Sequence, residues 1–116
     1  MEYIEGKPLK NYVGSREYYN ILKKALFNAF LLDEKGIFHG QLGRYYHIIN
    51  SENGVKFIDF ERGSFTQNPR NFMQIVGYYL YRDEKFNKKH LNLIVERYKR
   101  NRNNALNEII KLIDVI

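Results

Sequence analysis

One stretch of this 116-residue chain constrains its fold most, residues 36–61, with the sequence GIFHGQLGRYYHIINSENGVKFIDFE. Asn53-Gly54 stands between two runs of β-branched and aromatic residues. Asn and Gly both tolerate the positive φ of a type I′ turn, so this pair predicts a β-hairpin. We expect the hairpin to bring the segment after His39 next to the segment before Asp59. A polar loop and an acidic strand end would then face one place.

A long helix is predicted before the hairpin, over residues 15–35. Apolar residues recur there at three- and four-residue spacing, Ser15 is a good N-cap, and Gly36 is a typical end. Phe27 and Leu31 widen the apolar stripe, which predicts that much of this helix is buried.

Helices are also predicted after the hairpin, over residues 69–114. Asn68 and Pro69 indicate a helix start, and residues 87–114 have the pattern of two further helices, the first capped by Asn87. Residues 62–68 are expected to form a loop. The chain is therefore predicted to be a single α+β domain, mostly helical, with a small β-hairpin that carries the site.

Composition limits the classes of function. The chain has no cysteine, which excludes a disulfide framework and a Cys-ligated zinc site. No apolar run approaches the roughly 18 to 20 residues that span a bilayer, and the N-terminus is unlike a signal peptide. We expect a cytoplasmic protein that does not enter a membrane. The net charge of +6 invites a nucleic-acid or anionic partner.

The end of the second hairpin strand has the composition of a cation site. Asp59 and Glu61 are two residues apart, so their side chains point the same way from a strand. Mg²⁺ takes few carboxylates and leaves its other positions to water and phosphate. His47 is a further candidate ligand, and the alternative is a strand histidine with no metal. Equally, the two acids could cap a helix or pair with Arg62.

The order of HGQL, HIIN and IDFE resembles the catalytic core of the protein-kinase-like superfamily. In that family a loop H-x-D-x-x-x-x-N precedes a hairpin and then D-F-G, or D-F-E in choline-kinase-like members. The short stretch after residue 61 is similar to RIO-like and archaeal predicted serine/threonine kinases. The resemblance implies a kinase-like C-lobe, with residues 15–35 as its long core helix and residues 36–61 as its catalytic-loop-like hairpin.

The resemblance assigns roles residue by residue. His39 matches the loop histidine, which is structural in the family and packs near the phenylalanine matched by Phe60. Asp59 matches the metal-binding aspartate, and Glu61 matches the acidic third position. Gln41 falls where the family has its catalytic aspartate. A neutral amide cannot take a proton from a substrate hydroxyl as a carboxylate does. The family's second metal ligand falls on Tyr46, one residue before His47.

Residues 1–9 resemble the hinge between the two kinase lobes. The resemblance implies that Glu2, Tyr3 and Ile4 offer backbone groups to the adenine of ATP. A docked N-terminal arm is the alternative. The Gly-rich loop and strand lysine of complete kinases are not found in the 116 residues.

Basic residues could contact phosphates in two places. Arg44 follows the predicted loop and could instead form a surface ion pair. Residues 82–102 contain eight basic and three acidic residues, including Lys88, Lys89, Arg97 and Arg100. This Lys85–Arg102 patch, with Phe86 and Tyr98 interleaved, could bind nucleic acid. A solvated helical face is the alternative.

Three functions follow from these patterns. The first is a kinase-like phosphotransferase that uses ATP and Mg²⁺ on a protein substrate. The second is an inactive pseudokinase-type module that binds protein partners, favoured by Gln41 and Tyr46. The third is a nucleic-acid-binding domain. Homo-oligomerisation is compatible with each of them.

Overall fold

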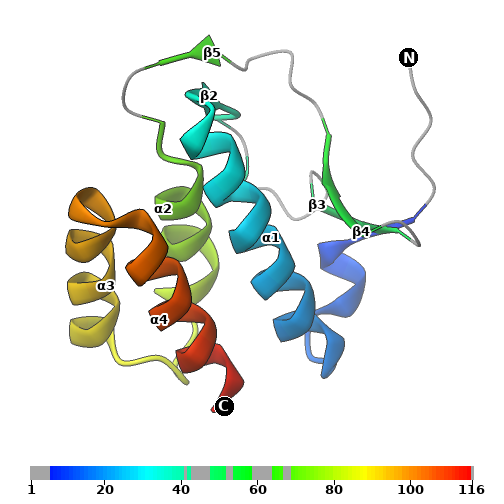
Figure 1. The fold of residues 1–116 in the computed structure, drawn as a ribbon. Helices are drawn as coiled ribbons and strands as arrows, with labels where there is room; N and C mark the ends of the chain where they lie inside the picture. The colour runs from blue at the N-terminus through cyan, green and yellow to red at the C-terminus, as the bar shows by residue number, and fades with distance from the viewer. Residues whose placement is uncertain are drawn as a thin grey trace.

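A computed structural model gives the fold, and it describes residues 6–40, 42, 48–51, 54–58, 64–66 and 69–115. This part of the chain is α+β and mostly helical, as predicted, and its strands form small antiparallel sheets that include the predicted hairpin (Figure 1). In chain order the elements are β1 (Lys7–Pro8), the 3₁₀-helix η1 (Leu9–Tyr12), α1 (Glu17–Glu34), β2 (Ile37–Phe38), β3 (Ile48–Ser51), β4 (Gly54–Phe57), β5 (Ser64–Phe65), α2 (Asn71–Ile75), the π-helix η4 (Val76–Leu80), α3 (Lys88–Arg100) and α4 (Arg102–Asp114).

Helix α1 is the centre of the core. It packs against α2 and α4 on one side and against β4 on the other (Figure 1). Its buried stripe follows the predicted spacing, and Gly36 ends the helix with φ +73°. The expected cap at Ser15 is wrong. Its hydroxyl donates to Tyr12 O at 2.7 Å, and the residue before the helix is Arg16.

The predicted burial of Phe27 and Leu31 is also wrong. Their exposed fractions are 47% and 39%. Each residue of a helix is turned by about 100° from the one before it. Phe27 therefore points away from the core that Leu26 faces. Helix α1 has a partly uncovered apolar side.

The hairpin of β3 and β4 is confirmed, with a shift of one residue in its turn. Ser51 pairs with Gly54, which has φ +112° and is the first residue of β4. Glu52 and Asn53, which connect the paired ends, lie outside the described residues.

Two short strands were not expected from the sequence. Lys7 and Pro8, in the segment that resembles a hinge, form β1 and pair with Asn50 and Ile49 of β3. Gly6 precedes them at φ +149°, where a Cβ would lie 2.5 Å from Asn50 O, so a larger residue does not fit there. Strand β5 lies within the predicted loop 62–68 and pairs with β2. Strands of two residues are too short to show an alternating pattern.

The second half of the chain contains the predicted helices. The start at Pro69 is wrong, because α2 begins at Asn71, and Asn68 lies outside the described residues. Asn87 caps α3 as predicted, accepting a hydrogen bond from His90 N at 3.1 Å. No helix in the described part of the chain is both long and apolar enough to cross a membrane.

Candidate functional site

The loop after β2 is held on its backbone by side chains of α2 and η4. Asn71 Oδ1 accepts from His39 N at 2.8 Å, and Gln74 Nε2 donates to Gly40 O at 3.1 Å. Gln74 Oε1 accepts from Leu42 N at 3.1 Å, and Tyr79 donates its hydroxyl to Leu42 O at 2.5 Å. These three side chains, Asn71, Gln74 and Tyr79, are called the loop clamp below. They fix the backbone on both sides of Gln41 in the sequence.

His39 connects the loop to the end of the hairpin. Its side chain is fully buried, Nε2 lies 2.6 Å from Ile58 O, and the ring meets the Phe57 ring edge-on with centroids 6.3 Å apart. The loop therefore lies beside the strand that runs into Asp59, as the hairpin predicted. A buried histidine that bonds a backbone carbonyl positions two segments relative to each other.

A buried carboxylate supports the loop clamp from beneath. Asp33, in the last turn of α1, accepts from Asn71 N at 2.9 Å, Asn71 Nδ2 at 2.8 Å and Phe72 N at 3.2 Å. The Tyr98 hydroxyl of α3 donates to Asp33 Oδ2, the oxygen that also accepts from Phe72 N. Asp33 thus supplies the N-terminal cap of α2 that a local residue would normally supply, and its negative charge suits the positive end of that helix.

Burial perturbs the titration of this pair. It raises the pKa of Asp33, while the hydrogen bonds from Tyr98, Asn71 and Phe72 act in the opposite direction. Burial and the neighbouring Asp33 raise the pKa of Tyr98 far above its usual value. Tyr98 therefore stays protonated and donates its hydrogen bond at every physiological pH. Its ring also stacks on Phe72, with centroids 4.1 Å apart, which fixes α3 against α2.

Most of the predicted site residues lie outside the described residues. They are Glu2, Tyr3, Ile4, Gln41, Arg44, His47, Asp59, Phe60 and Glu61. Within the described ranges, no three His, Asp or Glu side chains are grouped so that they could hold a metal ion. The described geometry therefore consists of the residues that support the loop and the hairpin end of the candidate site, namely His39, Asp33 and the loop clamp.

The predicted aromatic residues of the Lys85–Arg102 patch are not available to nucleic acid. Phe86 and Tyr98 are only 4% and 2% exposed, so neither can stack on a base, and that expectation is wrong. Of the four predicted basic contacts, Arg97 pairs with Glu108. Lys88, Lys89 and Arg100 are exposed and have no ion pair with a described carboxylate.

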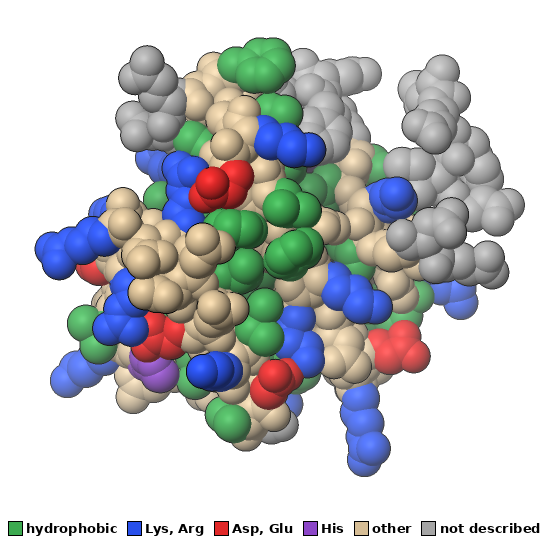
Figure 2. Space-filling view, viewed as in Figure 1, with side chains coloured by type: hydrophobic (Ala, Val, Ile, Leu, Met, Phe, Trp, Pro, Cys, Tyr) green, Lys and Arg blue, Asp and Glu red, His purple; other side chains and the backbone are tan. Residues whose placement is uncertain are grey.

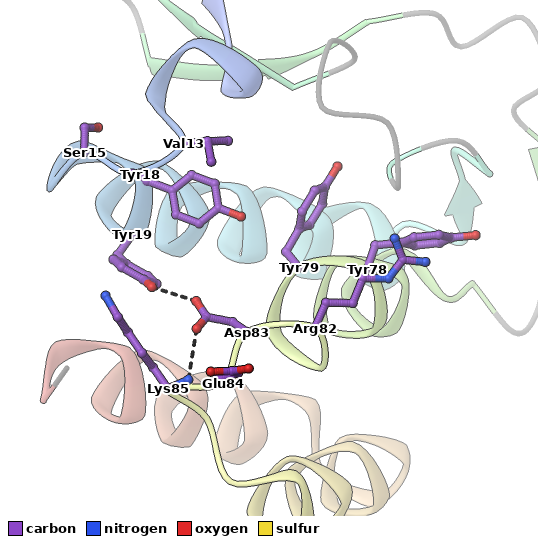
Figure 3. Close-up of a pocket in the computed structure, with 11 residues that line it drawn as sticks. Val13, Ser15, Tyr18, Tyr19, Tyr78, Tyr79, Arg82, Asp83, Glu84 and Lys85 are labelled. Atoms are coloured by element: carbon purple, nitrogen blue, oxygen red, sulfur yellow. Dashed lines mark hydrogen bonds between the residues drawn. The ribbon is translucent and has the colours of Figure 1, made fainter.

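A hollow of about 460 Å³ lies between the start of α1 and the turn after η4 (Figure 3). Tyr19 donates to Asp83 Oδ2 at 2.6 Å, and burial together with Asp83 raises the pKa of Tyr19 to about 12. The lining residues include two basic side chains, Arg82 and Lys85, and two acidic ones, Asp83 and Glu84. The hollow therefore has no excess charge with which to attract an ion.

Sequence reasoning missed the supporting residues Asp33, Tyr79 and Tyr98. Asp33 is a polar residue at a position where the helical stripe would reach the core, and this was the available signal. Tyr79 and Tyr98 fit an apolar stripe, and nothing in that pattern indicates which polar group their hydroxyls reach. Asn71 and Gln74 lie on the predicted second-half helix, and their described partners include the backbone of the loop.

The chain was compared with protein-family models and with curated proteins, and neither comparison found a match.

Proposed function

We propose that the chain is a kinase-like phosphotransferase module, resembling the C-lobe of RIO-like and archaeal serine/threonine kinases. The observation that supports this most directly is the 2.6 Å contact between His39 Nε2 and Ile58 O. It holds the loop of the form H-x-Q beside the strand that leads to Asp59. Phosphoryl transfer depends chiefly on positioning and charge neutralisation, which a rigid loop and an acidic strand end can supply.

The roles in this proposal follow the chain's own residues. Asp59 holds Mg²⁺, with Glu61 or His47 as a further ligand, and Glu2 to Ile4 contact the adenine of ATP through the backbone. The bound metal would neutralise charge on the phosphates. Gln41 orients the acceptor hydroxyl of a protein substrate by hydrogen bonding, but does not remove its proton. The loop clamp keeps the backbone around Gln41 in place while the substrate binds.

Thermal unfolding with and without Mg-ATP tests the binding step. Ligand at about ten times its Kd adds about 1.4 kcal/mol to the unfolding free energy, which corresponds to a rise of about 5 °C in Tm for a chain of this size. We expect this rise for the unchanged protein and its loss in Asp59→Asn. Glu84→Gln, at an exposed acid away from the loop, is the matched control and should keep the rise. No rise at millimolar Mg-ATP would count against the proposal.

A catalytically inactive, pseudokinase-type binding module is the second candidate, because Gln41 stands where the family has a catalytic aspartate. Transfer of the terminal phosphate to a generic protein substrate separates the two. In the pseudokinase case, Mg-ATP still raises Tm but no labelled protein forms. In the phosphotransferase case, slow transfer is measured and Gln41→Asp increases its rate.

A further inference from the structure

A groove on the outer side of α1 combines an apolar floor with lysines. It is a hollow of about 560 Å³ between α1, β4 and α4. Figure 2 shows hydrophobic side chains gathered on the face that α1 and α4 form, with Lys and Arg side chains around them. The lining residues are Lys23, Lys24, Phe27, Asn28, Gly54, Val55, Lys56 and Ile110.

The apolar part of the groove is built from three elements. Phe27 of α1 is 47% exposed, Ile110 of α4 is half-buried, and Val55 of β4 is buried. Leu31, one helical turn beyond Phe27, extends the exposed stripe along α1. The Asn28 side chain donates to Val55 O at 2.6 Å, which fixes α1 against β4. This bond joins two of the elements that line the groove.

Among the described residues, the charged side chains that line the groove are all basic. They are Lys23, Lys24 and Lys56. Lys23 is partly neutralised, since its Nζ lies 2.5 Å from Asp114 Oδ1. Lys24 and Lys56 are exposed and form no ion pair with any carboxylate among the described residues. Lysines next to an exposed aromatic side chain suit a partner that carries carboxylates beside apolar anchors.

We propose that this groove is a docking site for an acidic segment of another protein, with one or two large apolar side chains that contact Phe27 and Ile110. Two copies of this chain joined groove to groove would bring lysines together, which disfavours that arrangement. The proposal does not depend on the proposed phosphotransferase function.

The test is a selection of displayed random 12-residue peptides on the immobilised full chain. We expect the recovered peptides to be enriched in Asp and Glu beside Phe, Leu or Ile. One recovered peptide is then synthesised with a fluorescent label. Its affinity should be at least about tenfold lower for the single variant Phe27→Ala than for the unchanged protein, and likewise for the double variant Lys24→Glu with Lys56→Glu. Its affinity should also fall as salt is raised from about 50 to 300 mM.

Matched controls lie on other elements. Phe65→Ala removes a more exposed aromatic side chain from β5, and Lys88→Glu with Lys89→Glu reverses two charges on α3, so both should leave the affinity unchanged. Circular dichroism of each variant is the check that it is folded. If Phe27→Ala is unfolded, the double variant Lys24→Glu with Lys56→Glu still tests whether the peptide binds in the groove.

Four results would overturn the proposal. The first is that no peptide is enriched over empty beads, and the second is that the peptide binds the groove variants as tightly as the unchanged protein. The third is that the chain binds only phosphatidylserine vesicles and needs Phe27 to do so. The fourth is self-association in sedimentation that Phe27→Ala abolishes.

Discussion

Asn71→Ala is expected to destabilise the fold strongly, because Asn71 is fully buried and joins three segments. Its side chain accepts from His39 N at 2.8 Å and donates to Asp33 Oδ1 at 2.8 Å and to Ile37 O at 2.5 Å. Truncation leaves the buried His39 N–H and the partly buried Ile37 carbonyl without this partner, at about 1 to 3 kcal/mol each. Asp33 keeps the bond from the Asn71 backbone. We expect a loss of about 4 kcal/mol, a large part of the stability of a small domain.

Urea unfolding followed by circular dichroism measures this loss. The midpoint should fall while the slope stays the same, since the folded and unfolded surfaces are unchanged. Gln74→Ala is the matched control, because it removes two hydrogen bonds to the same loop from a half-buried position. Water can replace those bonds, so we expect about 1 kcal/mol. An Asn71→Ala loss below about 1 kcal/mol, or one no larger than that of Gln74→Ala, would refute the reasoning.

Three further outcomes are expected from the structure. Tyr98→Phe keeps the stacked ring but removes a hydrogen bond to Asp33, so urea unfolding should show a loss of about 1 to 3 kcal/mol, and no loss would contradict the contact. Burial raises the pKa of Asp33, so the folded chain holds this proton more tightly than the unfolded chain does. The contribution of Asp33 to the unfolding free energy is therefore greatest below its unfolded pKa, and it falls as the pH rises through the folded pKa. A ¹³C carboxyl titration should place this pKa above about 3.9, and a lower value would mean that the hydrogen bonds outweigh burial. If Lys88 and Lys89 bind single-stranded nucleic acid, the affinity measured by gel shift should fall steeply as salt is raised, and binding should be lost in the double variant Lys88→Ala with Lys89→Ala. A shift that does not depend on salt would exclude this surface.

The sequence by itself determined the local elements. Its 3.6-residue periodicity determined α1, α3 and α4, and its alternation of runs around Asn53-Gly54 determined the β3–β4 hairpin. These patterns act between residues close in the chain, so they can be read without knowing the fold. They also predicted that His39 would lie beside the strand before Asp59.

The tertiary structure decided which polar groups meet. Helix α2 begins at Asn71 because Asp33, 38 residues earlier, satisfies its first N–H groups, and no local cap indicated this start. Likewise β5 is paired because β2 lies beside it, and Phe27 is exposed because no described element covers that side of α1. Hydrogen bonds and burial between distant residues depend on the packing of whole elements, whereas periodicity describes only one element at a time.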